Sequence, residues 1–188
     1  VAEINSLFKY FEGREQDFYD TFGFNMYNIS SDGSVNYNYE YLILKYYDYV
    51  WSGDYSINQL YNGSVDTGFW NENVGKFVNF LGQYGINANR ANGEHLFNKS
   101  DIINEYQRLI DSGTQNVMIC SWGYRLLDYD TGALSFRSGE GDGHAMDVIG
   151  IENGNLIVSS WGKKYILDLD HMGNYGEAYS YFNTMNYE

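Results

Sequence analysis

His144 is the residue whose type and surroundings best suit catalytic chemistry. It follows a glycine-rich loop and begins a β-rich run, which would place its ring at the edge of a sheet. An imidazole there can act as general base and acid in amide hydrolysis if a nucleophile and an orienting acceptor lie beside it. His95 and His171 lack such surroundings and are interpreted as surface residues. No two histidines have metal-ligand spacing, so we expect neither a metal site nor a cofactor.

The only cysteine, Cys120, excludes internal disulfides and sites built from several cysteine ligands. It ends a β-rich run over residues 117–120. A free cysteine in such a strand is usually a small buried apolar residue. We therefore expect Cys120 to be packed in the interior and not to be the nucleophile.

Charge and composition exclude some classes of function. The 188 residues include 25 acidic and 11 basic ones, and a net charge of −14 is unfavourable for binding nucleic acid. No segment approaches the roughly 18 apolar residues of a membrane span, and the first residues do not resemble a signal peptide. We expect a soluble protein without membrane insertion. Twenty tyrosines, abundant Asn and Gly, and no proline favour a bacterial protein that is secreted or displayed on the cell surface.

Apolar residues at spacings of three and four predict helices in the first part of the chain. They cover residues 3–12, 36–51, 70–84 and 100–113. Ser100 is expected to cap the last helix, and Gly85 and Gly113 to end the third and fourth. Turn-forming residues predict a loop over residues 23–34 that leads into the second helix.

The second part of the chain has short β-rich runs separated by Gly, Asn and Asp. They cover residues 117–121, 144–151, 155–161 and 165–169. Helices followed by strands predict an α+β class, with a helical half of about residues 1–113 packed on a small antiparallel sheet in residues 114–188. The length favours a single domain over residues 1–188.

Residues 143–169 resemble the histidine hairpin of papain-like cysteine peptidases. In that family a glycine-flanked histidine opens a strand, a tight turn follows, and the next strand ends in a polar residue before Ser-Trp-Gly. The matching residues here are His144, Gly150, Asn153, Gly154, Ser159, Ser160, Trp161 and Gly162. The preceding segments LIDSG and NVMIC resemble the helix-turn-strand unit of the bacteriocin-processing-peptidase-like and streptopain-like branches. The resemblance extends over residues 101–170 and implies a papain-like fold.

The resemblance also implies roles for residues in the first half. In the family the nucleophilic cysteine stands at the N-terminus of a long helix, and Leu44 to Tyr46 resemble the end of that helix. Ser34 stands nearest to the position of the cysteine, and Asn28 nearest to that of the oxyanion-hole glutamine. We therefore expect a long helix that begins within two residues of Ser34 or Asn36 and points its N-terminus at His144 across a cleft.

The group that orients the histidine in the family corresponds here to Ser159 or Ser160. A hydroxyl is a weaker acceptor than a carboxylate or an amide. Asp147 would point to the opposite face of the strand from His144 and is a poor substitute. Trp161 either shields the histidine and contacts substrate or packs in the core, and the strand of Cys120 corresponds to one that lines the substrate pocket.

A missing cysteine and a weak orienting group predict a catalytically degenerate, papain-like domain that keeps a cleft for a peptide or protein ligand. An active secreted peptidase or amide hydrolase, in which a native cysteine was changed to serine, is one alternative. A module that binds a peptide or a glycan, or acts as an inhibitor, is another.

Overall fold

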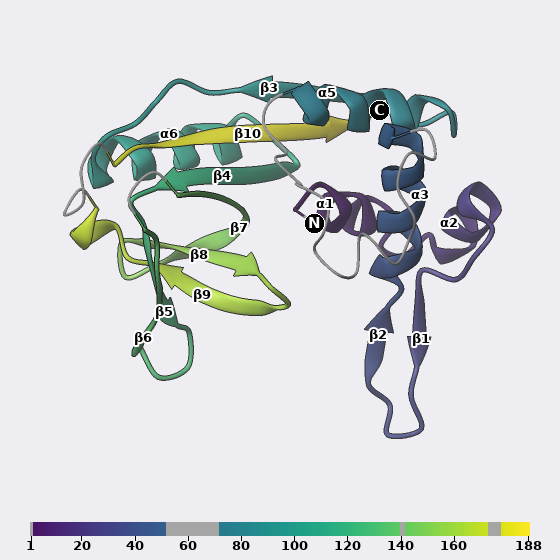
Figure 1. Cartoon of the computed structure of the whole chain (residues 1–188), viewed down its shortest axis with the longest axis horizontal. Helices are drawn as coiled ribbons and strands as arrows, with labels where there is room; N and C mark the ends of the chain where they lie inside the picture. The colour runs from purple at the N-terminus through teal and green to yellow at the C-terminus, as the bar shows by residue number, and fades with distance from the viewer. Residues whose placement is uncertain (1, 52–71, 140–141, 173–177) are drawn as a thin grey trace. The chain divides into compact units, whose positions relative to one another are not determined.

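The computed structural model describes residues 2–51, 72–139, 142–172 and 178–188 (Figure 1). They divide into two compact units, residues 3–88 with 187–188 and residues 89–186. The predicted α+β class is confirmed by helices together with a large antiparallel sheet, and the papain-like fold stays a prediction. The second unit includes the helix of residues 100–113, which the sequence had grouped with the helical half. No helix in the described ranges is long and apolar enough to cross a membrane.

Helices with aromatic contacts build the first unit. They are α1 (Ala2–Tyr10), α2 (Glu15–Phe22), α3 (Tyr39–Trp51) and α5 (Glu72–Gly82). Phe8 of α1 stacks on Phe18 of α2, and Tyr46 of α3 contacts Phe77 of α5 edge-on. Gly85 has a φ of 73°, and as predicted it stands just beyond the end of α5, where a left-handed residue stops a helix.

A β-hairpin stands where the sequence predicted a loop and the start of a helix. Its strands are β1 (Tyr27–Ile29) and β2 (Val35–Tyr37), and α3 begins only at Tyr39. The prediction of a helix starting near Ser34 or Asn36 is therefore wrong. The physical reason is the turn chemistry of residues 30–34. Gly33 has a φ of 84°, and its N–H donates to the carbonyl of Ser30, so the chain reverses instead of coiling.

An eight-stranded antiparallel sheet forms the centre of the second unit, in the order β3-β10-β4-β7-β8-β9-β5-β6. The strands are β3 (Ala88–Asn92), β4 (Asn116–Trp122), β5 (Arg125–Asp128), β6 (Leu134–Arg137), β7 (Gly143–Glu152), β8 (Asn155–Ser160), β9 (Lys163–Leu167) and β10 (Ser180–Tyr187). The short helix η1 (Leu169–His171) follows β9. The four predicted β-rich runs all lie in this sheet, and β3, β5, β6 and β10 are additional.

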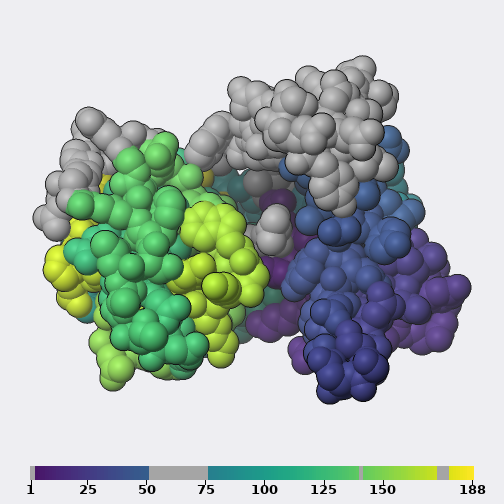
Figure 2. Space-filling view, turned by 60° about the horizontal axis from the view of Figure 1, so that its bottom comes forward, coloured from purple at the N-terminus to yellow at the C-terminus, as the bar shows by residue number. Residues whose placement is uncertain are grey.

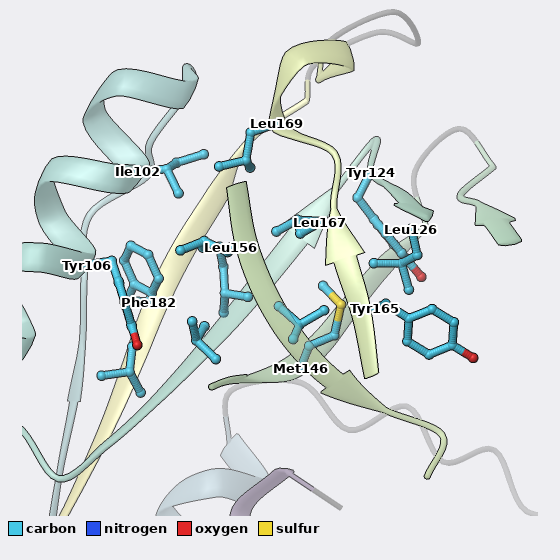
Figure 3. Packing of buried hydrophobic residues seen from close by; sticks show 14 of the residues in the cluster. Ile102, Tyr106, Tyr124, Leu126, Met146, Leu156, Tyr165, Leu167, Leu169 and Phe182 are labelled. Carbon is cyan, nitrogen blue, oxygen red and sulfur yellow. The ribbon is translucent and has the colours of Figure 1, made fainter. Parts of the chain in front are cut away.

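Helix α6 (Lys99–Asp111) covers one face of the sheet, which we call the core face. Ile102 and Tyr106 of α6 pack with Phe182 of β10 and with Met146 and Leu156 of the central strands (Figure 3). Figure 1 shows α6 running alongside β10 and β4.

The residue that caps α6 is Asn98 and not Ser100, as the sequence had predicted. The side chain of Asn98 accepts a hydrogen bond from the Asp101 N–H at 2.9 Å. Asn98 lies in the extended conformation that a capping residue requires, whereas Ser100 already lies inside the helix.

Phe182 tests how much the core face contributes to stability. It is 1% exposed in the centre of this cluster, so Phe182→Ala is expected to lower the free energy of unfolding by about 3–5 kcal/mol. The matched control is Phe97→Ala, because Phe97 is 64% exposed and should change stability by no more than about 0.5 kcal/mol. Urea unfolding followed by circular dichroism measures both. Equal effects of the two variants would contradict the described core.

Candidate functional site

His144 lies at the start of β7 and forms a hydrogen bond with a serine, as the family resemblance implied. Its Nε2 lies 2.6 Å from the Oγ of Ser160, which is 7% exposed at the end of β8. Ser160 is the only side chain in the described ranges that hydrogen-bonds to this ring. The contact engages Nε2, so Nδ1 is the ring nitrogen left to exchange a proton with a bound molecule.

A β-bulge in β7 decides that the partner is Ser160 and not Ser159. Gly150 pairs with Ile157, but Val148 already pairs with Val158, so Ile149 is an extra residue in β7. Side chains alternate between the faces of a sheet, and one extra residue exchanges the faces for the rest of the strand. His144 consequently shares the core face with Ser160. Ser159 is paired with Asp147 on the other face.

Two aromatic rings stack on His144. The Trp161 indole stacks on it with a centroid distance of 4.4 Å and an interplanar angle of 16°. The buried ring of Tyr124 lies nearly parallel to it at 5.9 Å. This burial lowers the pKa of His144 below its ordinary value of 6.5 and raises the pKa of Tyr124, so both side chains are neutral at pH 7. His144 can therefore accept a proton or donate a hydrogen bond, as a general base or a binding group does.

Trp161 holds its position at a cost in backbone strain. Its φ is 45° and that of Gly162 is 74°, the left-handed pair of a two-residue turn between β8 and β9. The turn between β7 and β8 has the same conformation, with φ of 50° and 73°, but uses Asn153 and Gly154, the residues that such turns prefer. A bulky residue with positive φ costs about 1–3 kcal/mol. Trp161 is 52% exposed, so only part of its apolar surface is buried in return.

Phe136 also belongs to this aromatic group, although the sequence did not predict it. Its ring lies 5.2 Å from that of Trp161 and 5.6 Å from that of Tyr124. A second bulge explains its position: Leu126 pairs with Phe136 and Leu127 with Leu134, which leaves Ser135 unpaired. Phe136 therefore shares the core face with Leu126. The alternation of Leu134 and Phe136 is the signal for a strand here, but it would place both side chains on one face.

Gly143, the residue before His144, allows close approach of a tryptophan. A Cβ atom at this position would lie 2.7 Å from the Nε1 of Trp122 and closer still to two of its ring carbons. The same indole stacks on Tyr179 with an interplanar angle of 12°. Trp122 therefore packs flat against the backbone at the start of β7, where only glycine leaves room for it.

The residues predicted in the first unit occupy a different environment. Asn28 lies on β1 and donates to Asn38 at 2.9 Å. Ser34 is exposed in the hairpin turn, where its hydroxyl donates to Asp32 at 2.7 Å. Neither stands at a helix N-terminus. Because His144 belongs to the second unit, the predicted approach of Ser34 to His144 stays a prediction.

Cys120 is buried, as predicted, on the face of the sheet opposite to His144. It pairs with Ala145 in β7, whereas His144 pairs with Ser121, so the thiol and the imidazole point to opposite faces. The amide of Asn183 donates to its sulfur at 3.3 Å. Asp147 also lies on the face opposite to His144, in register with Met118, as the alternation predicted.

The other two histidines are surface residues, but each has aromatic or charged neighbours that the sequence did not predict. His171 is 52% exposed and its Nδ1 binds both oxygens of the buried Asp168, at 2.8 and 2.9 Å. Arg125 lies 3.5 Å from the same carboxylate. His95 is exposed and packs on Tyr179 at a centroid distance of 4.3 Å. None of these residues hydrogen-bonds to His144.

Comparison of this chain with protein-family models, with curated proteins and with solved structures gave no match.

Trp161→Asn tests whether the indole keeps water from His144. Asn-Gly suits the turn, so the hairpin should form, but the exposed imidazole should regain hydration. We expect the pKa of His144 to rise toward 6.5, measured by NMR titration of its ring resonances and assigned with His144→Gln. An unchanged pKa would show that the indole does not exclude water from the ring.

The lowered pKa of His144 makes the free energy of unfolding depend on pH. Because the pKa of His144 is lower in the folded protein, the unfolded chain binds a proton more readily. The contribution of His144 to the free energy of unfolding is therefore fully present above about pH 6.5. It is lost as the pH falls from about 6.5 through the pKa of the folded state. The loss should be smaller in Trp161→Asn than in the original protein, as determined by urea unfolding at a series of pH values.

Gly143→Ala tests the packing of Trp122. The added methyl group would overlap the indole, so we expect a loss of about 1–3 kcal/mol in stability and a changed tryptophan near-ultraviolet circular dichroism spectrum. The control is Gly150→Ala in the same strand, where a Cβ meets no atom within 4 Å. A spectrum that changes equally in both variants would mean that Trp122 does not lie against Gly143.

Proposed function

We propose that this chain is a papain-like, cysteine-peptidase-related domain that binds peptides at His144 without cleaving them. The proposal rests on the hydrogen bond between His144 and Ser160 and on the stacking of Trp161 on the His144 ring. In that family the histidine, the orienting residue and the tryptophan follow one another along the chain in the same order. A serine hydroxyl can accept from the ring, but it is weaker and less rigid than an amide or carboxylate. The proposal includes a secreted or cell-surface location, which rests on composition alone.

The surroundings of Ser34 argue against catalysis by this residue. An alcohol needs a strong, oriented base to become a nucleophile. The hydroxyl of Ser34 instead donates to Asp32. The hydrogen bonds that the backbone N–H and the hydroxyl of Ser34 donate lower the pKa of that exposed carboxyl, which makes Asp32 a poor base. The hairpin also gives Ser34 no helix dipole, because α3 begins at Tyr39.

Cys120 is also unsuited to act with His144. The two residues lie on neighbouring strands, but their side chains point to opposite faces of the sheet. A nucleophile must come within hydrogen-bond reach of its base. The sheet itself stands between the thiol and the imidazole, so reaction at Cys120 would need a different base.

Hydrolysis by Ser160 is the second candidate, and the 2.6 Å contact with His144 favours it. This distance matches that of a nucleophile and its base. Two features oppose it. Ser160 is 7% exposed, so a substrate carbonyl has little access, and in the described part of the chain no carboxylate hydrogen-bonds to the His144 ring to strengthen it as a base.

Incubation with casein and with a pooled library of synthetic hexapeptides, analysed by mass spectrometry, distinguishes these functions. We expect no cleavage products, because no described nucleophile has both access and an oriented base. We also expect the hexapeptide pool to shift the NMR resonances of the His144 ring and the Trp161 indole. The matched control is His171→Gln, which alters an exposed histidine outside the site and should leave both results unchanged.

Cleavage that disappears in both Ser160→Ala and His144→Ala would establish the second candidate. Cleavage lost in Ser34→Ala and His144→Ala would restore Ser34 as the nucleophile. If the peptides shift only resonances far from His144 and Trp161, the binding proposal is wrong.

A further inference from the structure

Tyr124 is the most buried member of the aromatic group that includes His144. The four rings form a closed circuit of contacts, with centroid distances of 5.9 Å from Tyr124 to His144, 4.4 Å from His144 to Trp161, 5.2 Å from Trp161 to Phe136 and 5.6 Å from Phe136 to Tyr124. Trp161 is 52% and Phe136 39% exposed, whereas Tyr124 is 3% exposed. Tyr124 therefore lies on the buried side of a group whose other members reach the surface.

The position of Tyr124 at the margin of the core brings it close to that surface. Figure 3 shows Tyr124 beside Leu126, at the end of the core cluster away from Tyr106. In Figure 2 the green segment with β5 and β6 and the yellow-green segment with β8 and β9 lie next to each other on the surface. Phe136 belongs to the first of these segments and Trp161 to the second. A molecule bound where they meet would approach Tyr124 without disturbing the centre of the core.

The hydroxyl of Tyr124 has no hydrogen-bond partner in the described part of the chain. Tyr124 is instead held by its backbone, because its N–H donates to the Oγ of Ser138 at 2.9 Å and its carbonyl accepts from the Ser138 N–H at 3.0 Å. A tyrosine that is buried to this extent usually hydrogen-bonds through its hydroxyl. A bound molecule beside His144 is therefore the source from which we expect the missing partner.

The charge of Asp142 limits what this partner can be. Burial raises the pKa of Tyr124, and the negative charge of the Asp142 carboxylate raises it further. The hydroxyl is therefore protonated at pH 7 and available as a donor, and its end of the ring lies near Asp142, an exposed residue directly before β7. A negatively charged acceptor would be repelled by the same carboxylate. A neutral acceptor, such as a carbonyl oxygen, suits this donor better.

We propose that the Tyr124 hydroxyl donates a hydrogen bond to a backbone carbonyl oxygen of the bound peptide, beside the group that His144 holds. The inference rests on the proposed function, because the peptide is the ligand of His144. Every residue of a peptide offers such an uncharged acceptor. Tyr124 is then a binding residue that recognises the peptide backbone, whatever the side chains are.

Titration of the full chain with acetyl-trialanine methylamide, followed by NMR, tests the proposal. This uncharged peptide offers backbone amides and has only methyl side chains. We expect it to shift the resonances of the His144 ring and the Trp161 indole in a saturable way, and these shifts give its affinity. Sodium acetate at the same ionic strength and concentration should shift neither signal, because Asp142 repels a carboxylate.

Tyr124→Phe removes the hydroxyl and keeps the ring. We expect this variant to bind the peptide roughly threefold to tenfold more weakly, which is the effect of one lost hydrogen bond. Its urea midpoint should be unchanged or higher than that of the original protein, because no hydrogen bond within the described structure is lost. The matched control is Tyr165→Phe. Tyr165 is 7% exposed and contacts Trp161 edge-on at 6.2 Å, and its substitution should leave the affinity unchanged.

Equal affinities of Tyr124→Phe and the original protein, or equal weakening by Tyr165→Phe, would overturn the role of Tyr124 while peptide binding at His144 stands. A lower urea midpoint of Tyr124→Phe would show that the hydroxyl has a partner within the protein and would also overturn it. Shifts caused by acetate would overturn the choice of a neutral acceptor. If the trialanine peptide shifts neither signal, recognition of the backbone is wrong, and the hexapeptide pool then decides the proposed function separately.

Discussion

A single extra residue in β7, Ile149, determines which groups meet at the candidate site. On one side of it, Ile151 pairs with Leu156 and Gly150 with Ile157, and on the other side Val148 pairs with Val158. If the first register continued, His144 would share a face with Ser159. The bulge brings it to Ser160, at the margin of the core that α6 covers. The imidazole is therefore held by the same packing that stabilises the sheet, because Met146 and Val148, which lie on its face of β7, belong to that core.

The position of Trp161 over His144 has a cost in backbone strain and an effect on the charge of the imidazole. Trp161 adopts a strained turn conformation and remains half exposed, yet it covers one face of the His144 ring. Burial keeps the imidazole neutral, and with Ser160 on Nε2 its Nδ1 is left to act on a ligand. A residue chosen for stability alone would be Asn, as in the neighbouring hairpin. Such conflicts between local preference and actual residue are expected at functional sites.

In the proposed function, the oriented imidazole of His144 acts as a binding group. Ser34 is engaged with Asp32 in a hairpin turn, and Cys120 lies on the opposite face of the sheet. Ser160 touches the ring but is enclosed with it. In the proposed function, the neutral ring of His144 holds the backbone of a peptide by one hydrogen bond.

Local patterns in the sequence were sufficient to predict most helices and four strands, and the family resemblance implied the contact of His144 with one of two serines. These features depend on residues close in the chain: the apolar stripes of α5 and α6, the glycine that follows α5, and the Asn153-Gly154 turn. The hairpin at Ser34, the choice of Ser160 and the position of Phe136 were decided only by tertiary structure. Bulges at Ile149 and Ser135 arise from hydrogen bonding and packing between distant strands, and one residue of register moves a side chain to the other face. The sequence is compatible with either register, and the pairing with neighbouring strands determines which one forms.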